Sequence, residues 1–168
     1  MRELSRVFLF WGLCFIAASA TVAQEPERQR KSMEGLKAVC IQVDDAGFNA
    51  RRMGLNPAAL EKEIRQQLGS SGLRVDSEAL ECLRVRINAG EIRAGSGENE
   101  LYLGYAAHLD LMLVQPVSLL RSPLSVDAVT WMLSDFVHGR GDFSGRVRKA
   151  AGILVEGFIS EYRAANRK

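Results

Sequence analysis

The sequence is poor in the residues and motifs on which common catalytic and metal sites depend. Among 168 residues it has two histidines and three cysteines, and it lacks the GxSxG, HExxH and CxxC patterns. It also lacks a complete Walker phosphate loop and a GxGxxG pattern between a strand and a helix. These absences argue against an α/β-hydrolase, a zinc peptidase and a nucleotide-binding enzyme, so we expect no cofactor and no bound metal.

The chain also lacks a strong net charge. Twenty-two Lys and Arg residues stand against 20 Asp and Glu residues, which gives a formal net charge of +2. Proteins that bind nucleic acids or anionic membranes usually carry a clustered basic face, and this balance indicates none. We therefore expect no nucleic-acid partner.

A run of about 20 uncharged apolar residues, long enough to span a bilayer, is absent as well. The longest apolar run, 7–18, follows a basic start and precedes small residues, which is the layout of an export signal. Cleavage after Ala23 fits this layout, and cleavage after Ala20 is the alternative. The sequence thus predicts a signal peptide over 1–23 and a periplasmic or secreted mature protein with no transmembrane span.

The mature chain is expected to fold as one domain. Residues 24–35 are rich in charge and lack an apolar period, so they are expected to form a flexible lead-in. The fold should begin at Leu36 and occupy 36–168, because no repeat or linker divides this stretch. Its length suits a single hydrophobic core.

Apolar periodicity predicts the elements of this domain. Alternating residues indicate strands over 36–43, 73–75, 82–89, 100–117 and 125–137, with a turn-rich loop over 90–100. Apolar residues spaced by three and four indicate helices over 58–69 and 144–166. The alternation places one set of strand residues in the core: Leu101, Leu103, Tyr105, Ala107, Leu109, Leu111, Leu113, Val129, Trp131 and Leu133. The predicted fold is α+β, a single mostly antiparallel sheet with two main helices packed on one face.

The stretch HGRGDFSGR, 138–146, contains the adhesion tripeptide Arg-Gly-Asp and three glycines. Its place between a strand and a helix favours a tight turn, with Asp142 or Ser144 as the helix cap. Arg140 and Arg146 lie where a helix dipole attracts anions, so a weak anion site is the alternative to a purely structural turn.

Polar side chains gather on the strand faces opposite the aliphatic rows. The candidate binding residues there are Arg84, Arg86, Tyr102, His108 and Asp110. His108 and Asp110 lie two apart and point the same way, an arrangement that could serve acid–base chemistry or a metal. Because no third partner is evident, a half-exposed polar face is favoured over a catalytic site.

Two cysteines remain after the predicted cleavage, Cys40 and Cys82. Each falls on the side opposite its strand's aliphatic row, so they would face each other if the two strands were neighbours in register. A disulfide is then possible, and export favours it. Lipid attachment at Cys14 is less favoured, because bulky Leu13 stands where such sites carry a small residue.

The stretches VCIQVDD and RQQLGSSGLRV, followed by strands and a long closing helix, resemble the amino-terminal α/β domain of TolB. The runs AVTWMLSDF and FISEYRAANRK are similar to parts of secreted bacterial proteins. The resemblance carries no functional residues over to this chain. Export without a catalytic constellation predicts a non-enzymatic module of the cell envelope that binds another envelope protein or itself. The alternative is a small-ligand carrier or enzyme with a pocket near His108 and Asp110.

Overall fold

The structure is a computed structural model, and it describes residues 27–44, 47–95 and 100–167. One five-stranded sheet has the order β2-β1-β3-β4-β5. Its strands are β1 (Ala38–Val43), β2 (Arg74–Val75), β3 (Cys82–Ala94), β4 (Leu101–Ser118) and β5 (Ser125–Gly139). β1 pairs in parallel with β2 and β3, whereas β3, β4 and β5 form an antiparallel meander. The predicted α+β class is confirmed.

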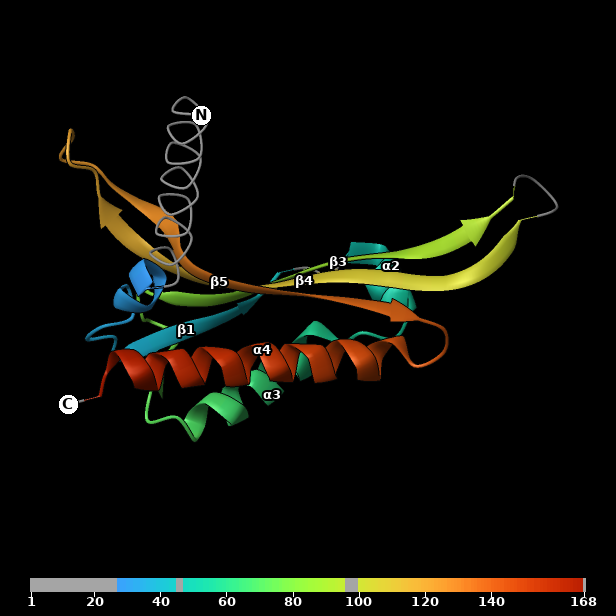
Figure 1. Ribbon diagram of the computed structural model, residues 1–168, viewed down its shortest axis with the longest axis horizontal. Helices are drawn as coiled ribbons and strands as arrows, with labels where there is room; N and C mark the ends of the chain where they lie inside the picture. The colour runs from blue at the N-terminus through green and yellow to red at the C-terminus, as the bar shows by residue number, and fades with distance from the viewer. Residues whose placement is uncertain (1–26, 45–46, 96–99, 168) are drawn as a thin grey trace, which may run out of the picture.

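The structure contains the helices α2 (Gly47–Arg52), α3 (Pro57–Gly69) and α4 (Phe143–Ala165), and residues 27–31 form a further helical turn. Figure 1 shows α3 and α4 side by side on one face of the sheet. Each helix buries the stripe that its period predicts: Leu60, Ile64 and Leu68 in α3, and Val147, Ala151, Leu154 and Phe158 in α4. The core therefore lies between these helices and the sheet. Among the described residues, α3 and α4 leave the opposite sheet face open, and we call it the open face.

Polar contacts tie the two helices to each other. Arg148 of α4 donates to Glu63 of α3 at 2.9 Å, and the Gln67 amide donates to the Gly152 carbonyl at 3.0 Å. The neighbouring Glu63 carboxylate raises the pKa of Arg148. At Gly157, an added Cβ would lie 2.7 Å from a Leu133 methyl, so this glycine permits α4 to approach β5 closely.

Residues before Leu36 pack against the rest of the fold. Met33 is fully buried in the core, and the Ser32 hydroxyl donates to the Thr130 carbonyl of β5 at 3.2 Å. The Asn166 amide, at the end of α4, donates to the Met33 carbonyl at 3.0 Å. Ser32 and Met33, which the sequence placed in the lead-in, thus contact distant elements of the fold, and no local apolar period indicates these contacts. The domain bounds stay a prediction.

Two register shifts change the predicted strand faces. One lies between Leu113 and Val114 of β4 and sets Val129 opposite Val114, on the open side. The other lies between Ile92 and Arg93, in a stretch of β3 that was expected to be a loop. Leu101 and Leu103 are exposed, contrary to expectation, because the β3–β4 hairpin extends past the helices (Figure 1). A bulge flips side-chain parity, which alternation along one strand does not reveal.

Gly104 of β4 lies against the end of β5, where the structure leaves no room for a side chain. Its φ is +144°, and an added Cβ would collide with the backbone carbonyl of Gly139 on β5. We expect Gly104→Ala to lower the free energy of unfolding by about 2 kcal/mol, measured by urea denaturation. Gly90→Ala is the matched control, because nothing lies within 4 Å of its added Cβ. Equal midpoints for the two variants would contradict this account.

Candidate functional site

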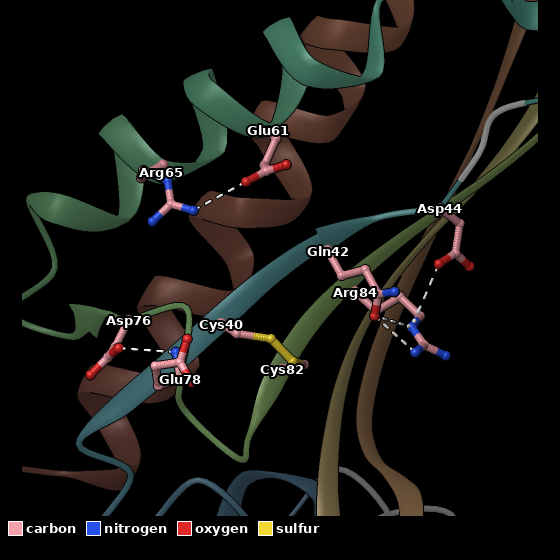
Figure 2. The surroundings of a disulfide bond; sticks show 9 residues. All are labelled: Cys40, Gln42, Asp44, Glu61, Arg65, Asp76, Glu78, Cys82 and Arg84. Carbon is pink, nitrogen blue, oxygen red and sulfur yellow. Dashed lines mark hydrogen bonds and ion pairs between the residues drawn. A yellow bond between two sulfur atoms is a disulfide. The ribbon is translucent and has the colours of Figure 1, made fainter.

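The open face of the sheet, which points away from α3 and α4, carries the predicted polar residues. Arg84 and Arg86 both approach the Asp44 carboxylate, each with Nε at 3.6 Å. Arg84 also donates to the Gln42 side-chain oxygen through Nε at 3.2 Å and Nη2 at 2.9 Å. Figure 2 shows Gln42, Arg84 and Asp44 meeting where β1 and β3 run together. Two guanidinium groups therefore share one carboxylate at the half-exposed surface.

His108 and Asp110 lie on the same open face, in the next strand. Asp110 faces Arg86 on one side and Ser134 on the other in the strand register. Its Oδ1 accepts from the Ser134 hydroxyl at 2.6 Å and lies 3.6 Å from His108 Nε2. The carboxylate thus stands between the imidazole and the hydroxyl. Because a histidine base must contact the hydroxyl that it activates, this order does not form a nucleophilic triad.

Tyr102 does not join the other four candidates. The bulge at the end of β3 sets it opposite Arg93, so it shares the face of odd-numbered β3 residues rather than that of His108. Arg93 bonds there to Glu91 and Glu100. The bond from Arg93 lowers the pKa of Glu91, and the same two carboxylates raise the pKa of Arg93. The structure therefore brings together Arg84, Arg86, His108 and Asp110 only.

Apolar neighbours of this polar group were not predicted as site residues. Met132 and Phe136 of β5 face Met112 and His108 of β4 in register. They are 45% and 60% exposed, and Val129 further along β5 is 53% exposed. The alternation of β5 contained the signal, because an inward Trp131 implies that side chains an odd number of positions away, such as Met132 and Phe136, face outward. The open face thus has a polar half on β1 and β3 and an apolar half on β5.

Cys40 and Cys82 form a disulfide bond between β1 and β3 (Figure 2). The two residues are direct register partners in the parallel pair, with Cα atoms 4.4 Å apart. The alternation of side chains in the sequence predicts that each cysteine lies on the side of its strand opposite the aliphatic row. The disulfide therefore lies on the open face, at the edge of the polar group.

The stretch HGRGDFSGR forms the turn between β5 and α4. Gly139 and Gly141 have φ values of +150° and +82°, and the Asp142 carboxylate caps α4 by accepting from the Gly145 amide at 2.8 Å. Arg140 Nε donates to the Leu103 carbonyl at 2.6 Å. Because the aspartate of the adhesion tripeptide is the helix cap, the turn has a structural role. An anion site at Arg140 and Arg146 stays a prediction.

Of two surface hollows formed by the described residues, neither is lined by His108 or Asp110. One of about 240 Å³ lies between β5 and α4 and is lined by Asp135–His138, Arg146, Lys149, Ala150 and Ile153. The other, of about 470 Å³, lies between the carboxyl ends of α3 and α4. Within the described ranges, no group of three or more His, Cys, Asp or Glu side chains could hold a metal ion.

Comparison with known proteins identifies no family. No family model and no curated protein match the sequence. Among solved structures, the fold is similar to a minor lipoprotein from Acinetobacter baumannii, at 10% identity over 77% of this chain and 93% of that one, with a TM-score of 0.38. A PelC dodecamer from Paraburkholderia phytofirmans matches at 14% identity over 80% of this chain and 89% of that one, with a TM-score of 0.40.

Rare lipoprotein B from Shewanella oneidensis matches at 10% identity over 77% of this chain and 90% of that one, with a TM-score of 0.25. Two of these three proteins are named as lipoproteins. At such identities and scores, the likeness extends only to a general arrangement of helices and strands. The resemblance to the TolB domain stays a prediction.

The export signal predicted over 1–23 lies outside the described residues. In the part of the chain that the structure describes, no helix is long and apolar enough to cross a membrane.

Proposed function

We propose that the protein is an exported, non-enzymatic module of the cell envelope that binds a protein partner through the open face of its sheet. The observation that carries this proposal is that exposed apolar side chains and basic side chains lie on the same face of the sheet. Exposed Met132 and Phe136 lie on β5, and Arg84 and Arg86 lie two strands away on β3. Aromatic, methionine and arginine side chains are the residues enriched in the cores of protein interfaces.

The geometry of the polar half fits a recognition surface better than a catalytic one. Asp110 is 8% exposed and already engaged by Ser134, and Arg84 and Arg86 are held by Asp44. Such restrained side chains lose less conformational entropy when a partner docks. The alternative of a ligand pocket or enzyme at His108 and Asp110 is favoured by no observation on the described residues.

The test places a photo-cross-linking amino acid at position 136 in the full chain, expressed in a bacterial envelope. We expect adducts from this position, and we expect Arg84→Glu with Arg86→Glu to abolish them. The matched control position is Leu80, which is 78% exposed in the turn before β3. An adduct of twice the chain's mass would identify the chain itself as the partner. Equal labelling from both positions, or none from position 136, would refute the proposal.

A further inference from the structure

The hairpin that joins β4 to β5 projects beyond the body of the protein and has one apolar face. Figure 1 shows the hairpin rising away from α3 and α4. It lies at the same end of the molecule as the segment before β1 and the carboxyl end of α4. Val117 pairs with Val126, and the Leu119 amide donates to the Leu124 carbonyl, so these four side chains share a face.

The aliphatic side chains of this hairpin are largely exposed to solvent. Leu119, Leu124 and Val126 are 38%, 63% and 41% exposed, and Leu120 at the tip is fully exposed. Ser118 and Ser125 pair on the opposite face. The hairpin is therefore amphipathic, and its apolar face continues the helix side of the sheet rather than the open face. This surface is separate from the proposed protein-binding surface.

Basic residues gather at the same end of the molecule. The hairpin carries Arg121 and no acidic residue between 117 and 126. Ser32 contacts Thr130 at the hairpin's base, which brings the helical turn 27–31 beside it. The carboxyl end of α4 is joined to this segment through Asn166 and Met33. Three segments meet at this end: the hairpin 117–127, residues 27–37 and the carboxyl end of α4. Outside the Glu27–Lys31 ion pair, their exposed acidic residues are Glu34 and Asp127, and their exposed basic residues are Arg28, Arg30, Lys37, Arg121, Arg163 and Arg167.

We propose that this hairpin inserts its apolar tip into the surface of an anionic lipid bilayer, with the arginines contacting lipid phosphates. A convex tip crowned by a fully exposed leucine has the shape of an inserting element rather than of a groove. The tip lacks the aromatic side chains that protein interfaces favour. Apolar burial combined with basic charge is the pairing that holds proteins to anionic membranes. The near-neutral net charge of the whole chain conceals this local asymmetry.

A tryptophan placed at the tip reports insertion locally, whatever else holds the chain to a vesicle. Leu120→Trp in the full chain is mixed with phosphatidylglycerol vesicles, and the wild-type emission spectrum is subtracted. We expect a blue shift and quenching by brominated phosphatidylglycerol. Leu101→Trp is the matched control, since Leu101 is 62% exposed on the β3–β4 hairpin at the other end (Figure 1). Its spectrum should not change.

A second variant pair measures the contribution of the apolar face to binding. Leu124→Asp should weaken partition into phosphatidylglycerol vesicles about tenfold, because an aliphatic side chain no longer leaves water. Leu101→Asp, which changes an equally exposed leucine, should have little effect. Added salt and replacement of the lipid by phosphatidylcholine should both weaken insertion of the Leu120→Trp tip.

Several outcomes would overturn the proposal. These are an unchanged Leu120→Trp spectrum on vesicles, equal responses of Leu120→Trp and Leu101→Trp, or equal insertion into phosphatidylcholine. A blue shift that rises with protein concentration in the absence of lipid would show that a second copy covers the tip instead. The protein-binding proposal would survive each of these results, because its cross-links come from position 136 on the open face.

Discussion

Replacing Trp131 by alanine should lower the free energy of unfolding by about 3–5 kcal/mol, the largest loss that we expect from one substitution. Trp131 is 1% exposed and packs edge-to-face on Phe158 of α4, with ring centroids 5.1 Å apart. Its indole N–H donates to the Glu161 carboxylate at 3.1 Å. Truncation therefore leaves a large cavity where β5 meets α4 and removes a donor from Glu161.

The measurement is urea denaturation followed by far-ultraviolet circular dichroism, because the substitution removes the natural fluorophore of the core. Trp131→Phe is the control, since it keeps an aromatic ring against Phe158 while losing the hydrogen bond to Glu161. We expect it to cost about 1–2 kcal/mol. A midpoint for Trp131→Ala as high as that for Trp131→Phe would show that the β5–α4 contact is not tightly packed.

Removing the disulfide should cost about 2–4 kcal/mol. Cys40 and Cys82 are separated by 42 residues in sequence, so their bond restricts a long loop of the unfolded chain. It also joins β1 to β3, a parallel pair whose strands are connected through α2, α3 and β2. The double variant Cys40→Ala, Cys82→Ala should therefore unfold at a lower urea concentration than the oxidised wild type.

Reduction provides the internal control for this prediction. A thiol reductant should bring the wild-type midpoint down to that of the double variant, and it should leave the double variant unchanged. If the reductant shifts neither protein, the bond contributes nothing to stability. If it shifts both equally, the effect does not come from Cys40 and Cys82.

Part of the candidate site followed from sequence alone. Arg84, Arg86, His108 and Asp110 could be assigned to one side of their strands because side chains alternate with a period of two. Phe136 could have been found by extending the same rule outward from Trp131. Tyr102 could not be assigned correctly, because the bulge that turns it to the other face depends on how β4 pairs with β3. Asp44 entered the group only through contacts made by the folded chain.

What the sequence by itself determined is local: which segments are strands or helices, which stripe of α3 and α4 is buried, and the parity that lets Cys40 and Cys82 meet. The side-chain periods of 2.0 residues in strands and 3.6 residues in helices involve only residues close in sequence, so they can be recognised without knowing which segments pack together. Tertiary structure decided the strand order, the two register shifts, the packing of Met33 and the gathering of basic residues beside the β4–β5 hairpin. Each of these depends on contacts between segments far apart in the chain, whose free energies are set only when the sheet and helices pack together.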